Sequence, residues 1–66
     1  MRAEKLTMMA NQIGAFFKAQ GEKEAPAAIA DHLKKFWEPR MRRQLAEYIA
    51  GGGAGLHALV LEAAKT

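Results

Sequence analysis

Residues 26–42 read PAAIADHLKKFWEPRMR, a stretch that contains one helix, its end and the start of the next helix. Pro26 suits the first turn of a helix, because the proline ring already fixes a helical φ and the missing N–H would have no partner there. Pro39 disfavours helical geometry at the residue before it, so one helix should stop near residue 37 and another should open at residue 39. Between the prolines, five apolar residues recur at helical spacing and share one face: Ile29, Ala30, Leu33, Phe36 and Trp37.

The helical period continues in both directions from this stretch. Upstream, Gly21 is a natural C-terminal cap for a first helix. Its apolar face consists of Leu6, Met9, Ala10, Ile13, Phe16 and Phe17. Downstream, the third helix has an apolar face of Met41, Leu45, Tyr48 and Ile49, and Arg43 with Glu47 forms an i,i+4 pair on its outside.

Glycine interrupts the chain at residues 51–55, GGGAG, and a run of glycines is typical of a hinge. The last segment follows it, with Leu56, Leu59, Val60 and Ala63 on one face and Leu61 on the other. No stretch alternates as a half-buried strand would. The sequence therefore predicts an all-α fold in a single domain, 1–66: a small bundle of three main helices plus a short C-terminal helix after a glycine-rich hinge. The expected helices cover 2–20, 26–37, 39–50 and 56–65.

Composition limits the class of protein. A chain of 66 residues buries only about 60% of the surface that it exposes when unfolded, and without cysteine no disulfide adds stability. Half of the residues are hydrophobic and 26% are charged, which is typical of a globular chain. No apolar run approaches the roughly 20 residues that span a bilayer. We expect a cytoplasmic protein that is not embedded in a membrane.

The residues that catalysis requires do not form a recognisable pattern. His32 and His57 lack the close His or carboxylate spacing of a zinc site, and we interpret both as structural. The only hydroxyl residues besides tyrosine are Thr7 and Thr66, near the two ends. The glycines at 51–55 lack the lysine and hydroxyl of a phosphate-binding loop. These features favour a protein that is not an enzyme and acts by binding a partner, without a metal or cofactor of its own.

Aromatic and basic residues interleave around Pro39, as they do in many recognition surfaces. We expect Phe36 in the core, whereas Trp37 fits either the core or a partner contact. The last helix has no cleanly polar side, so either it is buried all round, which so short a chain can hardly achieve, or it docks on another protein. The first helix carries a strip of small residues on its back, which a partner could approach closely. The candidate partner-binding residues are Trp37, Arg40, Arg42 and Arg43, with Asn11 and Leu61 as secondary candidates.

Two segments, 9–17 (MANQIGAFF) and 29–42 (IADHLKKFWEPRMR), resemble the delta subunit of NAD-dependent formate dehydrogenase. The similarity covers roughly residues 5 to 50. The FWEPRMR block is its most specific part. Asp-Pro is commoner in that family at the place held here by His57-Ala58, so the resemblance does not establish how the last helix starts.

The resemblance implies a role that the composition alone does not. Complexes of that family oxidise formate to carbon dioxide. Their large subunits carry a molybdenum (or tungsten) pterin, iron–sulfur clusters, flavin (FMN) and NAD. The delta subunit is a small accessory member associated with assembly, cofactor insertion or stability. Its expected partner is the catalytic alpha subunit.

Two other interpretations remain open from the sequence. The basic cluster 34–43, in a chain of net charge +3, could bind nucleic acid, although Asp31, Glu38 and Glu47 dilute it. Alternatively, an unpartnered apolar face could pair with a second copy of the chain and give a homodimer in isolation.

Overall fold

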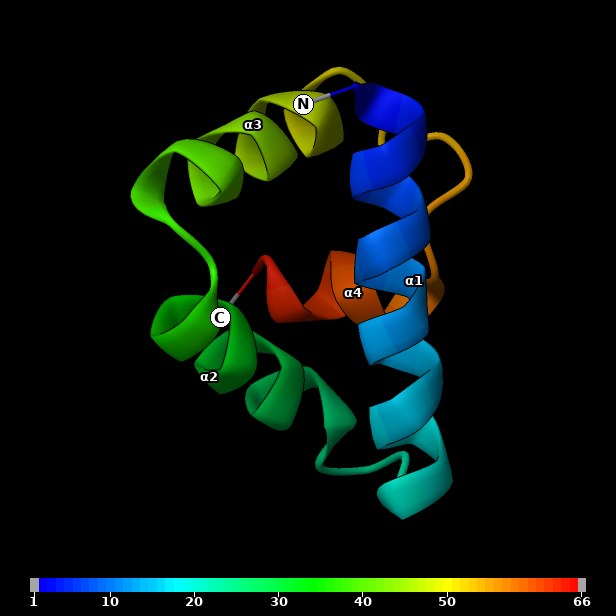
Figure 1. The fold of residues 1–66 in the computed structure, drawn as a ribbon. Helices are drawn as coiled ribbons and strands as arrows, with labels where there is room; N and C mark the ends of the chain where they lie inside the picture. Colours follow the sequence, from blue (N-terminus) through cyan, green and yellow to red (C-terminus); the bar gives the residue numbers. More distant parts are fainter. Residues whose placement is uncertain (1, 66) are drawn as a thin grey trace.

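The computed structural model describes residues 2–65, and these residues form four helices and no strand (Figure 1). The helices are α1 (Ala3–Gln20), α2 (Ala25–Phe36), α3 (Pro39–Ala50) and α4 (Ala58–Ala63). The expected all-α fold class is confirmed. The observed bounds of the three long helices lie within one residue of the expected ones, whereas α4 is four residues shorter than the expected segment 56–65.

The signals that end and start the long helices act locally. Gly21 follows α1, and its N–H donates to the carbonyl of Phe17 at 3.0 Å. Pro26 lies in the first turn of α2, and Pro39 is the first residue of α3. Glu38 has an extended backbone, with φ −64° and ψ 150°, as the residue before a proline prefers. Each boundary therefore follows from the conformational preference of a single glycine or proline.

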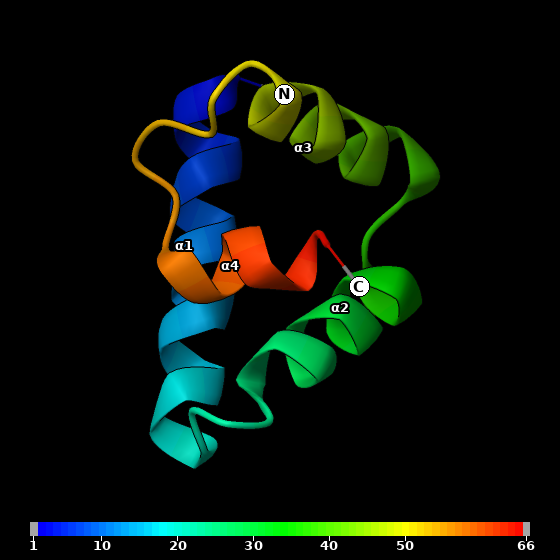
Figure 2. The same cartoon turned by 180° about the vertical axis from the view of Figure 1, so that it is seen from behind.

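The short helix α4 lies at the centre of the fold, between α1 and α2 (Figures 1 and 2). Two groups of buried residues make up the core, and α4 contributes Val60 to the first and Ala63 to the second. The first group is Leu6, Ala10, Trp37, Leu45 and Val60; the second is Ala25, Ile29 and Ala63.

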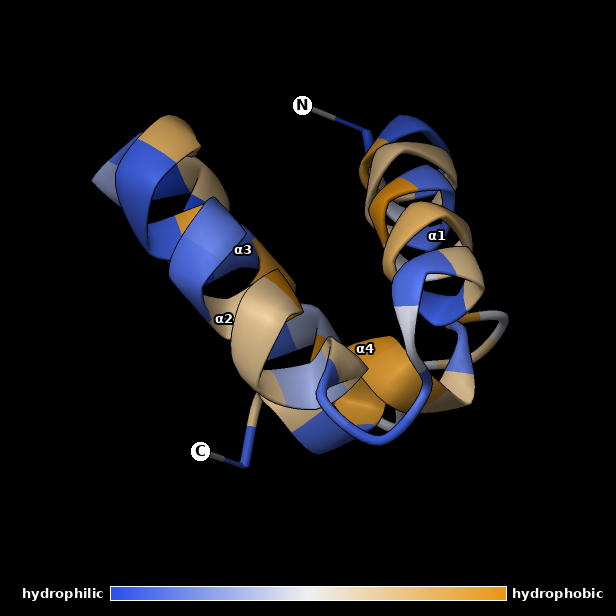
Figure 3. Cartoon of the chain, turned by 90° about the horizontal axis from the view of Figure 1, so that it is seen from below, coloured by the Kyte–Doolittle hydropathy of each residue, from blue (hydrophilic) through white to orange (hydrophobic). Residues whose placement is uncertain are grey.

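The last helix therefore packs within this chain's own core, and its docking on another protein stays a prediction. Figure 3 shows the apolar residues of α4 between α1 and the other helices. A helix of six residues is short enough for the longer helices to surround most of its circumference. Ala58 and Glu62, one turn apart, are exposed and give α4 the solvent-facing side that the pattern of 56–65 did not reveal.

Close contact between α1 and α4 depends on Gly14, which is buried. A Cβ atom on Gly14 would lie 3.1 Å from Cγ2 of Val60 and 3.4 Å from Cβ of His57. His57 also starts α4, because its Nδ1 accepts a hydrogen bond from the N–H of Leu59 at 3.1 Å. An aspartate followed by proline would suit the same two positions, so the departure at His57-Ala58 preserves the cap.

The glycine-rich segment is fastened to both α1 and α3. The side chain of Asn11 accepts a hydrogen bond from the N–H of His57 at 2.7 Å and donates one to the carbonyl of Gly55 at 2.9 Å. The hydroxyl of Tyr48 donates to the carbonyl of Ala54. Since these bonds hold Ala54, Gly55 and His57, the expected hinge is anchored where it leads into α4.

Replacing Asn11 with alanine should lower the free energy of unfolding by about 1–2 kcal/mol, because two backbone groups lose their partner. Thermal unfolding followed by circular dichroism measures this loss. The exposed neighbour Gln12 provides the control, since its replacement with alanine should change stability by less than about 0.5 kcal/mol. Equal melting temperatures for the two variants would show that Asn11 does not hold the loop.

Candidate partner interface

Four aromatic rings lie in series from the end of α1 to the end of α2, and we call them the aromatic row. Phe16 and Phe17 meet edge to face, with ring centroids 5.1 Å apart. Phe17 lies 5.9 Å from His32, and His32 lies 4.8 Å from Phe36. Edge-to-face and offset contacts at these separations are favourable arrangements for aromatic rings. The row therefore has a defined geometry across two helices.

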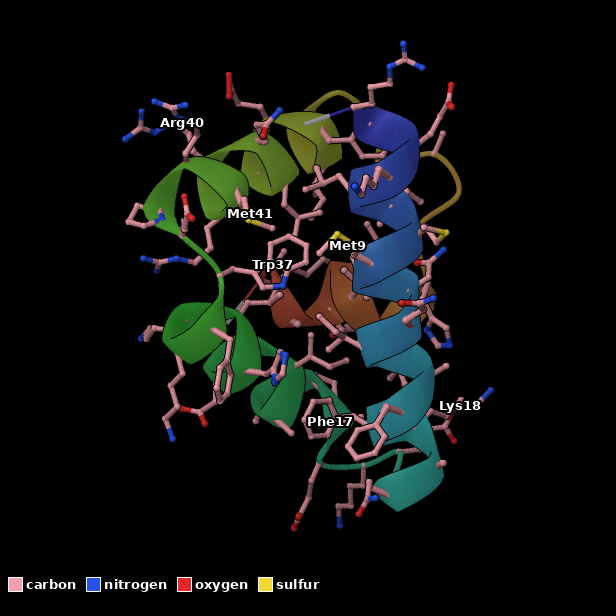
Figure 4. All side chains as sticks on the ribbon, in the orientation of Figure 1. Met9, Phe17, Lys18, Trp37, Arg40 and Met41 are labelled. Atoms are coloured by element: carbon pink, nitrogen blue, oxygen red, sulfur yellow. The ribbon has the colours of Figure 1, made fainter. Side chains whose placement is uncertain are left out.

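A groove of about 350 Å³ lies beside the aromatic row, and we call it the aromatic groove. Figure 4 shows Trp37 and Met9 pointing toward one another across the space between α1 and the α2–α3 connection, with Phe17 further along α1. Apolar and aromatic side chains supply most of the lining, which is Met9, Gln12, Ile13, Phe16, Phe17, His32 and Trp37. Such a lining suits an apolar group of a partner more than a charged one.

Both ends of the aromatic row are open to solvent. The exposed fraction is 73% for Phe36 and 58% for Phe16. The prediction that Phe36 lies in the core is wrong, and Phe16 lies at the exposed edge of the face to which the pattern assigned it. The buried sector of α1 is instead centred on Leu6, Ala10 and Gly14, since α4 packs there.

Trp37, which fitted either the core or a partner contact, lies in the core and is only 7% exposed. The helix ends at Phe36, and Trp37 adopts an extended backbone with φ −90° and ψ 139°. This change of backbone directs the indole away from the helical face and toward Leu6, Leu45 and Val60. Trp37 therefore has a structural role within this chain, and its contact with a partner stays a prediction.

The three arginines of α3 point in different directions. Arg40 and Arg43 are exposed, and Figure 4 shows Arg40 pointing away from the body of the molecule. Arg42 is half-buried and lines a second groove, described below. The expected Arg43–Glu47 pair is wrong: within residues 2–65 the i,i+4 ion pair is Asp31–Lys35, at 3.0 Å.

The two secondary candidates make contacts inside the chain. Both polar groups of the Asn11 amide bond to the segment before α4. Leu61 is half-buried, and its Cδ2 would lie 2.9 Å from a Cβ atom on Gly53. Asn11 and Leu61 therefore serve the packing of α4, whereas the aromatic row and the exposed arginines are open to a partner.

Comparison with protein families identifies the group to which this chain is similar. Residues 5–64 match the family model of the NADH-dependent formate dehydrogenase delta subunit, FdsD. The chain belongs to this family. The match includes α4 and the loop before it, and it contains the whole aromatic row. Searches of curated proteins and of solved structures gave no match to this delta-subunit chain.

Both histidines of this chain contact other residues of the fold. His32 is the third ring of the aromatic row, and His57 caps α4. Among residues 2–65 there is no group of three or more His, Cys, Asp or Glu side chains that could hold a metal ion. No helix in this part of the chain has the length and apolar character needed to cross a bilayer.

Proposed function

We propose that this chain is a non-catalytic accessory subunit that binds the catalytic alpha subunit of a cytoplasmic, NAD-linked formate dehydrogenase. Family membership supports the association with a formate dehydrogenase complex. The observation that carries the docking role is the exposure of Phe16 and Phe36 beside an apolar groove. A chain with so small a core gains little stability from leaving two phenylalanines in water, whereas a partner can bury them.

The aromatic row is the proposed centre of this interface. Burial of apolar surface contributes roughly 25 cal/mol per Å², and aromatic rings expose much surface with few rotatable bonds. The row is already held in place by its own ring contacts, so docking costs little side-chain entropy. Arg40 and Arg43 are proposed to lie at the rim of the same interface. There, each planar guanidinium group can form two hydrogen bonds with a carboxylate of the alpha subunit.

Binding of this kind supports assembly, cofactor insertion or stability without any reaction on the small chain. A subunit that binds one conformation of its partner raises the population of that conformation in proportion to its differential affinity. In this proposal the molybdenum (or tungsten) pterin, the iron–sulfur clusters, FMN and NAD all belong to the larger subunits. The accessory chain acts on them only through the alpha subunit's conformation.

The nucleic-acid alternative receives no specific support from the arrangement of segment 34–43. Trp37 is buried, Arg42 turns toward a groove, and Lys35 pairs with Asp31. The basic residues therefore do not form one continuous surface with an aromatic platform, which single-stranded nucleic acids require.

Co-purification of the tagged chain from its native cells tests the proposed function. We expect molybdenum-containing dehydrogenase subunits to remain bound through washes at both low and high salt, since the centre of the interface is apolar. Nuclease-sensitive material that leaves at high salt would favour nucleic-acid binding instead. Recovery of the tagged chain alone, as a dimer, would favour self-association.

A further inference from the structure

A second groove, of about 490 Å³, runs between α2, α3 and the end of α4, and we call it the α2–α3 groove. Its floor combines small and branched apolar residues, among them Ala30, Leu45, Ala46 and Ala63. Two basic side chains, Lys34 and Arg42, also line it. Small side chains along a groove let another backbone approach closely, while the branched ones offer apolar contact.

The charges that line this groove are not balanced within the chain. Asp31 is the acidic residue of the lining, and its carboxylate already pairs with Lys35 at 3.0 Å. Lys34 and Arg42 therefore leave the lining net positive. In addition, Nε of Arg42 is buried and has no hydrogen-bond partner among the described residues. A buried donor without an acceptor is costly, and a carboxylate is the acceptor that matches a guanidinium best.

The α2–α3 groove is separate from the aromatic groove. At 100° per residue, Lys34 projects from nearly the opposite side of α2 to His32, which lines the aromatic groove. The two grooves share no lining residue. An occupant of one groove can therefore bind without contacting the residues that line the other.

We propose that the α2–α3 groove binds a segment of a partner protein in which a leucine-type side chain adjoins an aspartate or glutamate. The carboxylate pairs with the positively charged guanidinium of Arg42 through its terminal N–H groups and lies near the ammonium of Lys34, and the apolar side chain contacts the alanines and Leu45 of the lining. Two features argue for this occupant: the unbalanced positive charge of the lining and its apolar side chains. This proposal concerns a different surface from the aromatic row, so its test is independent of the test of the aromatic row.

The test is a titration of the full ¹⁵N-labelled chain with N-acetyl-Leu-Glu-amide, followed by NMR. The matched control probe is N-acetyl-Leu-Gln-amide, which has the same shape without the charge. We expect the Arg42 Nε–H signal and the backbone amides of Ala30 and Ala46 to shift, with a Kd on the order of 1 mM for the charged probe. Binding of the neutral probe should be about tenfold weaker, because it lacks the charge-assisted hydrogen bond.

Two arginine variants complete the experiment. Arg42→Gln should weaken the charged probe to the level of the neutral one, whereas Arg40→Gln, on the exposed side of the same helix, should leave its affinity unchanged. The undisturbed spectrum of each variant shows that it is folded. Equal affinity for the two probes, equal effects of the two variants, or shifts confined to Phe16, Phe17 and His32 would overturn the proposal, as would the absence of shifts at 20-fold the expected Kd.

Discussion

Replacing Trp37 with alanine should leave most of the protein unfolded at 25 °C. The indole packs in the larger core group with residues from α1, α3 and α4, so its removal leaves a cavity that all three helices border. Truncation of a buried tryptophan costs about 3–5 kcal/mol, and the core of so short a chain rarely supplies more than about 3–5 kcal/mol in total. The loss of helical circular dichroism and the collapse of NMR chemical-shift dispersion measure this effect.

The neighbouring residue provides the matched control. Phe36 is 73% exposed, so Phe36→Ala should change the free energy of unfolding by less than about 0.5 kcal/mol. A larger effect for Phe36→Ala than for Trp37→Ala would show that the two aromatic residues exchange places and that the helix continues through residue 37.

Replacing Gly53 with alanine should lower the free energy of unfolding by about 2–3 kcal/mol. Gly53 has φ +62°, a left-handed conformation that costs other residues about 1–2 kcal/mol. Its Cβ atom would also lie 2.9 Å from Cδ2 of Leu61, and moving that half-buried side chain adds about 1 kcal/mol. In a domain of this size the melting temperature should fall by roughly 10–20 °C.

Gly51, two residues earlier, provides the control, because replacing it also removes a glycine but not one that has a positive φ. It has φ −85° and ψ 5°, and an added Cβ atom would meet its nearest neighbour, the carbonyl oxygen of Tyr48, at 3.6 Å. Gly51→Ala should therefore be neutral or stabilise by up to about 1 kcal/mol, because alanine restricts the unfolded chain. Equal destabilisation by the two substitutions would contradict the conformation described for Gly53.

The three long helices and their limits follow from the sequence because the responsible signals act locally. Gly21, Pro26 and Pro39 each restrict their own backbone or that of the residue beside them. The same reasoning fails for Phe36 and Trp37. A helical wheel places both on the core face, but the wheel no longer applies once the backbone becomes extended at Trp37. The proline two residues later was the available signal that the two side chains would diverge.

The central position of α4 could not be predicted from its own residues. Its apolar residues point in several directions, which is compatible with a partner or with the chain's own core. The features that decide between these alternatives lie on α1. Ala10 and Gly14 provide a surface small enough for α4 to pack closely, and Asn11 holds the loop that precedes it. Asn11 bonds to Gly55 and His57, which follow it by 44 and 46 positions, and only the tertiary structure brings these residues together. From the sequence alone, Asn11 was therefore predicted to contact a partner.

The candidate interface in the structure differs from the one predicted from the sequence, again because contacts between distant residues decide which side chains are exposed. Arg40 and Arg43 remain exposed as the pattern of α3 indicates, whereas the aromatic row forms only when Phe17, near the end of α1, packs against His32 of α2. Phe16 and Phe36 are 20 positions apart and lie on faces that a helical wheel assigns to the core. Their exposure reflects the shortage of partners within a chain of 66 residues.

The most direct test of the central claim is the affinity of the chain for the isolated catalytic alpha subunit, measured by calorimetry. The Phe16→Ser/Phe36→Ser double variant should bind at least about 100-fold more weakly than the original chain, since each ring is a proposed interface anchor. Met8→Ser, which changes an apolar residue that is 54% exposed and lies outside the aromatic groove, should bind within about threefold of it. Undiminished binding of the double variant would contradict the proposed interface, and failure of the original chain to bind the alpha subunit would contradict the accessory function itself.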